Sequence, residues 1–193
     1  MVVQANHAIP VVMTPRLRLR AFTPDDAAAL HRIMELGEVM RYFPTPTPPT
    51  LEQVEKFIAR QLEHWSEHGL GWWAIDSLAD DRLVGWAGLQ HLPETTETEV
   101  AYLIGREYWG KGLAVEAALA GLRFGFDALG KDTIIAVVHI DNVRSYRVLD
   151  KLGMTRDRRD SYFGIEVYHY TMDKTTFHQL YPTTPDISSD CAP

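Results

Sequence analysis

The sequence predicts an α/β protein of one domain, in which a mixed β-sheet is flanked by helices. The clearest evidence is a strand-like segment, Glu99–Ile104, that passes through a glycine-rich turn into an apolar helix predicted over residues 113–129. A second unit of this kind follows, with a strand over residues 133–140 and a helix over residues 141–152. Elsewhere, two-residue and helical periods alternate, which gives the order β-α-α-β-β-β-α-β-α-β-β.

The first third of the chain predicts a strand and two helices. Residues 16–20 alternate charged and apolar side chains, as a half-exposed strand does. Thr23, followed by proline and two aspartates, is a typical N-cap, and this helix has an apolar side. Four prolines within residues 44–49 predict a stiff loop. Thr50 and Gln53 form a capping-box signature for the next helix.

The remaining strands complete the predicted sheet. We expect the second helix to end at Gly69, followed by an antiparallel hairpin. His139 ends a strand that is apolar on both faces, so we expect it in the core. The strands are predicted over residues 71–76, 82–89, 133–140, 162–163 and 165–172. We assign the domain to residues 14–180, with an N-terminal arm (1–13) and a disordered tail (181–193).

Composition excludes several classes of partner and site. The formal net charge of -7 and the lack of a long basic run argue against nucleic acid, whereas a basic protein or an amine would suit this charge. Cys191 is the only cysteine, so a disulfide within the chain and a cysteine-based metal site are excluded, and we expect no metal. No apolar run reaches the roughly 18 residues that span a membrane. We therefore expect a cytoplasmic protein that binds no membrane.

The turn at residues 105–112 predicts a phosphate site. It contains three glycines and precedes a helix N-terminus, where free N–H groups and the positive end of the helix dipole attract anions. A dinucleotide fingerprint starting at Gly110 fails, because its sixth position is Val115. A P-loop reading lacks the magnesium-binding hydroxyl, because Gly112 takes its place, and a nucleotide hydrolase stays a remote alternative.

The segment from Tyr108 to Ala114 resembles the acetyl-CoA pyrophosphate loop of the GNAT superfamily of N-acetyltransferases. Trp109 stands where many members have Gln or Arg, which resembles the Rim-type branch that acetylates ribosomal proteins. The resemblance spans residues 14–172 and implies the GNAT fold, with acetyl-CoA as co-substrate. It implies transfer to a primary amine, either a protein N-terminal α-amine or a small-molecule amine. A CoA-binding sensor of the same fold is an alternative, and a homodimer is left open. The implied cofactor-binding residues are Leu103, Ile104, Trp109, Gly110, Lys111, Gly112, Leu113, Ala114, Asn142 and Ser145.

Acetyl transfer needs a base, an oxyanion donor and a partner for the leaving sulfur. Glu99 is the candidate base, acting through water. The resemblance implies a backbone N–H donor near Leu103. Many relatives use a tyrosine seven residues after Asn142, where this chain has Leu149. The Rim-type branch suggests Ser145 instead, with Tyr146 as the alternative. We expect the acceptor groove to include Tyr42 and the residues up to Thr50, together with Trp65, Trp72 and Trp73. For the three tryptophans, filling of the core is the alternative.

Overall fold

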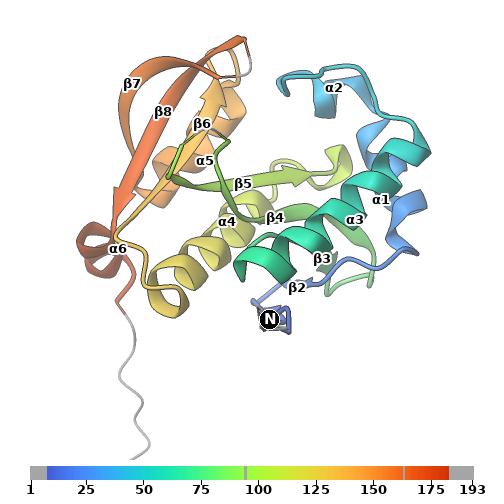
Figure 1. Cartoon of the computed structure of the whole chain (residues 1–193), viewed down its shortest axis with the longest axis horizontal. Helices are drawn as coiled ribbons and strands as arrows, with labels where there is room; N and C mark the ends of the chain where they lie inside the picture. Colours follow the sequence, from blue (N-terminus) through green and yellow to red (C-terminus); the bar gives the residue numbers. More distant parts are fainter. Residues whose placement is uncertain (1–7, 94, 163, 183–193) are drawn as a thin grey trace, which may run out of the picture.

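The computed structural model describes residues 8–93, 95–162 and 164–182 and contains one eight-stranded sheet (Figure 1). The strand order is β1-β2-β3-β4-β5-β6-β8-β7, and every neighbouring pair is antiparallel except β5 and β6. The mixed sheet predicted from the sequence is therefore confirmed. The strands are β1 (Val12–Met13), β2 (Leu17–Arg20), β3 (Trp72–Ser77), β4 (Leu83–His91), β5 (Thr98–Ile104), β6 (Thr133–His139), β7 (Thr155–Tyr162) and β8 (Ile165–Asp173).

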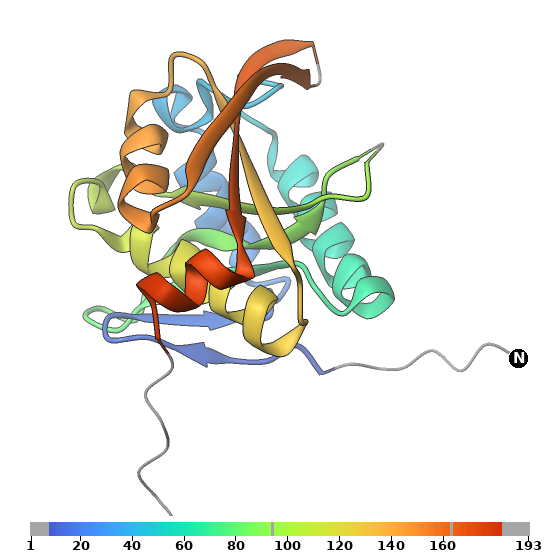
Figure 2. The ribbon, with the colours of Figure 1, turned by 90° about the vertical axis from the view of Figure 1, so that its left-hand side faces the viewer.

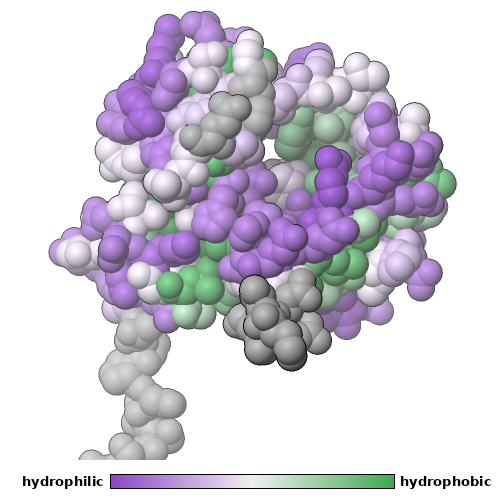
Figure 3. Space-filling view, viewed as in Figure 1, coloured by the Kyte–Doolittle hydropathy of each residue, from purple (hydrophilic) through white to green (hydrophobic). Residues whose placement is uncertain are grey.

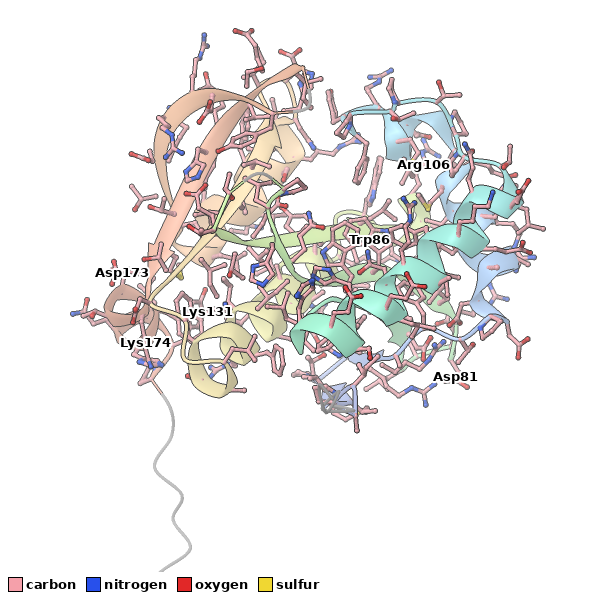
Figure 4. All side chains as sticks on the ribbon, in the orientation of Figure 1. Asp81, Trp86, Arg106, Lys131, Asp173 and Lys174 are labelled. Carbon is pink, nitrogen blue, oxygen red and sulfur yellow. The ribbon has the colours of Figure 1, made fainter. Side chains whose placement is uncertain are left out.

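Helices cover both faces of this sheet, as the two perpendicular views show (Figures 1 and 2). Helices α1 and α3 pack on one face through a cluster that includes Trp86, whereas α4 and α5 pack side by side on the other. Figure 4 shows Trp86 in the half of the molecule that α3 covers. The helices are α1 (Asp26–Met34), α2 (Gly37–Met40), α3 (Leu51–His68), α4 (Leu113–Arg123), α5 (Val143–Leu152) and α6 (Lys174–Leu180).

Helix α3 follows its sequence signals closely. The Thr50 hydroxyl accepts the Gln53 N–H at 3.3 Å, and the Gln53 side chain accepts the Thr50 N–H at 2.8 Å, which confirms the capping box. Gly69 ends the helix with φ of 66°, a left-handed conformation that costs glycine little. These local signals succeed because both partners of each interaction lie within one helical turn.

The start of α1 differs from the prediction. Thr23 is not the N-cap; the helix begins at Asp26, and Thr23 donates its N–H to the Asp26 carboxylate at 2.7 Å. The same carboxylate binds Arg20 at 2.8 Å, so an ion pair with β2 fixes this carboxylate in place. The predicted apolar side of α1 is confirmed, because Leu30 is fully buried with its neighbours Ala27, Ile33 and Met34.

Several elements were not predicted: β1, α2, α6 and most of β7. Strand β7 is an edge strand in which Thr155–Arg159 is exposed, so it shows no alternation of apolar side chains, and its pairing with β8 defines it.

Helix α4 was predicted to continue to Leu129; it does so through a π-helical turn at Phe124–Ala128, in which Leu129 N–H donates to the Phe124 carbonyl at 3.0 Å. Most of the predicted arm and tail, residues 1–7 and 183–193, lies outside the described residues.

The only parallel pair in the described sheet, β5 and β6, is joined at a single register position, Glu99 opposite Ile135. Beyond that position β5 runs on to Ile104 with no recorded partner on its β6 side. The two strands diverge toward their C-terminal ends, and each leads into a helix, α4 after β5 and α5 after β6. Ligands of open α/β sheets bind at such an edge. No helix among the described residues is long and apolar enough to cross a membrane.

Candidate active site

The turn before α4 has the geometry of an anion-binding loop. Gly110 and Gly112 have φ of 76° and 79°, and a Cβ added at Gly110 would meet nothing within 4 Å. No side chain caps the helix, and the N–H groups of Leu113, Ala114 and Val115 donate to no acceptor within the described part of the chain. Three unpaired N–H groups at the positive end of a helix fit a pyrophosphate.

A basic side chain is held beside this loop. The Arg16 guanidinium donates to the Lys111 carbonyl at 2.7 Å and pairs with Glu116 at 2.6 Å. Its Nη2 lies 3.6 Å from where a Cβ would stand at Gly112. Arg16, in the bend before β2, therefore brings guanidinium N–H groups to the loop, a contribution that the sequence alone did not reveal because it joins segments about a hundred residues apart.

Trp109 connects the two helix starts. Its indole N–H donates to the Ile104 carbonyl at 2.6 Å, and the Arg144 guanidinium lies 4.3 Å from its ring centre. Trp109 thus links the end of β5 to the first turn of α5. The structure thereby brings together the two segments that were predicted to bind the cofactor.

At the start of α5, Asn142 and Ser145 occupy the predicted positions with defined partners. The Asn142 side chain accepts the Ser145 N–H at 3.2 Å, so Asn142 is a helix cap. The Ser145 hydroxyl lies 2.7 Å from the hydroxyl of Tyr102 on β5, a residue that the sequence reasoning missed. Tyr102 shares one side of β5 with Val100 and Ile104, and this alternation was the only sequence signal for it.

The alternative candidate for the sulfur partner, Tyr146, and the residue at the usual tyrosine position, Leu149, both point elsewhere. Leu149 is 1% exposed and belongs to the core between α4 and α5. The Tyr146 hydroxyl donates to the carbonyls of His139 and Ile140, at 3.1 Å for His139. The Tyr146 hydroxyl is therefore already engaged by backbone carbonyls, whereas the Ser145 hydroxyl contacts another side chain, Tyr102.

Glu99 lies where β5 and β6 are still paired, and it is 5% exposed. Its carboxylate accepts the Gln90 side-chain N–H at 2.6 Å and the Val137 backbone N–H at 3.4 Å. Burial raises the pKa of Glu99 to about 7, although both hydrogen bonds favour the charged form. A carboxyl with a pKa near neutrality can accept and release a proton at physiological pH.

The predicted acceptor residues separate into two groups. Tyr42 lines a pocket of about 310 Å³ between α2 and the start of α5, and its ring lies 5.2 Å from that of His139. The surface in Figure 3 is hollowed between these two parts of the molecule. Contrary to expectation, His139 is half-buried beside this pocket. Figure 4 shows Arg106 beside α2, where it pairs with Glu38 of the pocket.

The tryptophans of β3 face opposite sides of the sheet. Trp72 is half-buried and stacks on Trp86 with ring centres 4.1 Å apart, on the face that α1 and α3 cover. Trp73 is fully buried, donates its indole N–H to the Pro10 carbonyl and packs against the buried Trp65. Trp73 points away from Trp72 because successive strand residues point to opposite faces. Trp73 and Trp65 are both buried in one core cluster, so the expectation that they line the acceptor groove is corrected and they fill the core. Among the described residues, no group of three ligating side chains could hold a metal ion.

Comparisons with known proteins agree with this geometry. A family model described as an acetyltransferase (GNAT) domain matches residues 16–155. The chain is 32% identical over 149 residues to the uncharacterized N-acetyltransferase YoaA of Bacillus subtilis (strain 168), covering 77% of this chain and 84% of that protein. The solved acetyltransferase (GNAT family) from Bacillus anthracis aligns with a TM-score of 0.76 and 26% identity, covering 86% of this chain and 99% of that one.

A putative ribosomal-protein-serine acetyltransferase from Vibrio cholerae also aligns, with a TM-score of 0.72 over 85% of this chain and 97% of that one. Its identity of 21% supports the shared fold alone. The family match argues against the nucleotide hydrolase alternative, because the matched family is one of acetyltransferases. The chain belongs to the GNAT acetyltransferase family, whose members transfer an acetyl group from acetyl-CoA to an amine.

Proposed function

We propose that this enzyme acetylates a protein N-terminal α-amine, as the Rim-type branch does, with Glu99 as the general base. The observation that carries the proposal is the buried Glu99 carboxyl, whose pKa of about 7 lies near that of an α-amine. An α-ammonium has a pKa of about 7.7–8, whereas a lysine-type amine has one of about 10.4. The sequence Trp109-Gly110-Lys111-Gly112 and the alternating arginines and leucines of residues 16–20 resemble the same branch.

The difference in pKa decides which acceptor this base can serve. Moving a proton from an α-ammonium to Glu99 is uphill by about one pKa unit, or roughly 1.4 kcal/mol. The same transfer from a lysine-type ammonium is uphill by about three units, or roughly 4 kcal/mol. Since Glu99 is nearly closed to solvent, we assign the transfer to an intervening water. Proton transfer to Glu99 therefore costs less free energy for an α-amine than for a lysine-type amine.

The other groups of the site have roles that follow from their positions. Acetyl-CoA supplies the activated thioester. The N–H groups at the start of α4 and the Arg16 guanidinium bind the pyrophosphate, because they offer donors and positive charge to the same loop. A backbone N–H of β5 near Leu103 donates to the thioester oxygen, since β5 has no recorded partner there on its β6 side. The Ser145 hydroxyl donates a hydrogen bond to the departing sulfur.

Acceptor recognition belongs to the pocket that Tyr42 lines. Its charged side chains, which include Glu38, Arg41, Asp141 and Arg144, are of both signs. Such a lining suits a peptide backbone next to an α-ammonium better than it suits a long polycation. A ribosomal or other cytosolic acceptor would place the enzyme in the cytoplasm, which is part of this proposal.

The test is a thiol-release assay with matched acceptors, preceded by calorimetric titration with acetyl-CoA. The panel contains peptides with a free N-terminus, the same peptides blocked at the N-terminus but carrying a lysine, and an aliphatic polyamine. We expect acetyl-CoA to bind and the free N-terminal peptides to give the highest kcat/KM. Preference for the blocked peptides or the polyamine would overturn the proposed acceptor. Binding of acetyl-CoA without turnover on any amine would favour the sensor alternative.

A further inference from the structure

Tyr102 joins the diverging end of β5 to the first turn of α5. Its hydroxyl lies 2.7 Å from the Ser145 hydroxyl and 3.4 Å from the Ser145 carbonyl. The contact spans 43 residues of sequence and crosses the region where β5 and β6 are no longer paired. Burial raises the pKa of Tyr102, so its phenol stays protonated and can act as a hydrogen-bond donor.

The hydrogen-bond arrangement at Ser145 follows from what each group can donate. The Ser145 backbone N–H already donates to the Asn142 side chain and carbonyl. A phenol is a stronger acid than an aliphatic alcohol, so Tyr102 donates and the Ser145 oxygen accepts. The Ser145 hydrogen then has no acceptor among the described residues other than the Tyr102 oxygen, and it is available to a ligand.

We propose that Tyr102 is a positioning residue that orients the Ser145 hydroxyl toward the leaving sulfur. It would compensate for the aliphatic Leu149 at the position where many relatives carry a tyrosine. The inference rests on the proposed function and deepens it, because it assigns a partner to the thiolate side of the same site.

The chemical step balances without a net proton from Tyr102 or Ser145. The amine nitrogen forms a bond to the acetyl carbon, the carbon–sulfur bond breaks, and its electron pair leaves on sulfur. The α-ammonium gives one proton to Glu99 through water before the attack, and the second proton of the bonded nitrogen passes through the same water to solvent. The Ser145 hydroxyl stabilises the thiolate by hydrogen bonding, and solvent protonates the thiolate afterwards. Tyr102 keeps its proton throughout, which agrees with its burial.

The experiment is a double-mutant cycle on the full chain. Rapid quench under single-turnover conditions measures the rate of the chemical step, and steady-state assays give kcat and KM. Tyr102→Phe should lower kcat about ten-fold and change the KM for acetyl-CoA less than two-fold, because the pyrophosphate contacts lie at α4. In a Ser145→Ala background, Tyr102→Phe should have no further effect on kcat. Ser145→Thr, which keeps a hydroxyl, should preserve the dependence on Tyr102.

The control is Tyr168→Phe, which removes a hydroxyl that binds Arg159 on the outer hairpin and should leave kcat unchanged. An unchanged kcat in folded Tyr102→Phe would overturn the inference. If Tyr102→Phe lowered kcat equally in the unmutated enzyme and in the Ser145→Ala background, the inference would also be overturned. Tyr102 would then act independently of the Ser145 hydroxyl. Failure of the unmutated enzyme to acetylate any amine would reject the proposed function instead, so the two failures are distinguishable.

Discussion

The two helix starts at the site, those of α4 and α5, occupy equivalent places and differ in how their N–H groups are satisfied. Each follows one of the neighbouring parallel strands, β5 or β6. Helix α4 has Gly112 at its N-cap position and therefore no side-chain cap, whereas the Asn142 side chain caps α5. A capping side chain stabilises a helix by about 1 kcal/mol, so α4 lacks stabilisation that α5 has. The difference teaches that α4 leaves its first N–H groups without partners among the described residues, whereas α5 satisfies one with a side chain. Under the proposed function, α4 offers N–H groups to the pyrophosphate and α5 offers the Ser145 hydroxyl to the sulfur.

The largest expected effect comes from closing the open helix start. Gly112→Val places a branched side chain at a φ of 79° beside the loop that must approach the phosphates. We expect the Kd for acetyl-CoA to rise about a hundred-fold, or roughly 2.7 kcal/mol, by calorimetric titration. The control is Gly130→Val, at a φ of 65° near the opposite end of α4, which imposes similar strain away from the loop. Equal affinities in folded Gly112→Val and Gly130→Val would place the pyrophosphate elsewhere.

Glu99 differs from both helix starts, because it lies near the beginning of β5, where β5 and β6 are still paired. Its pKa of about 7 means that the base form declines as pH falls below 7, so kcat/KM should fall about ten-fold per pH unit there. Glu99→Gln should lower kcat/KM about a hundred-fold at pH 8 and lose this dependence on the base. Glu107→Gln, at an exposed position, is the control. A pH profile identical to that of the unmutated enzyme would return Glu99 to a structural role.

The hydroxyl of α5 should matter for rate and not for affinity. Ser145→Ala removes one hydrogen bond to a developing charge, and we expect kcat to fall about ten- to a hundred-fold. The KM for acetyl-CoA should rise only slightly, because the proposed pyrophosphate contacts lie at α4. Single-turnover kinetics measure this split. An unaltered kcat would remove Ser145 from the mechanism and leave solvent water as the partner of the sulfur.

The stability of the fold should depend on Glu99 in the opposite sense from its activity. Its raised pKa means that the folded state retains a proton that the unfolded state releases between about pH 4.5 and 7. The stability that this carboxyl contributes is therefore full below pH 4.5 and is lost as pH rises through 7. Glu99→Gln should raise Tm relative to the unmutated protein at pH 8 and change it little at pH 4. Parallel Tm curves for the two proteins would contradict this.

The smallest effect tests the capped helix start. Asn142→Ala removes the acceptor of the Ser145 N–H, so the free energy of unfolding should fall by about 1 kcal/mol. For a protein of this size the corresponding decrease in Tm is about 2–4 °C. Thermal denaturation measures it, with Asn142→Asp as the variant that retains a capping oxygen. A Tm for Asn142→Ala equal to that of Asn142→Asp would show that the cap contributes nothing.

Local signals predicted more of the fold than of the site. The capping box of α3 and the strand–turn–helix unit at Gly112 were correct because each depends on residues a few positions apart. Strand β7 was missed because its exposed, charged side chains leave no period, and only β8 defines it. The Thr23 cap was wrong because Arg20 on β2 holds the Asp26 carboxylate, and that carboxylate accepts the Thr23 N–H.

The sequence by itself determined the order of most helices and strands, the glycine loop and the resemblance to the GNAT superfamily, because these are properties of contiguous residues. The tertiary structure decided which side chains meet. It paired Tyr102 with Ser145, set Arg144 on Trp109 and placed Trp73 in the core. It also buried Glu99, and that burial raises the pKa of Glu99 to about 7. Distances and burial depend on how distant segments pack, and a linear pattern of residue types does not contain that information.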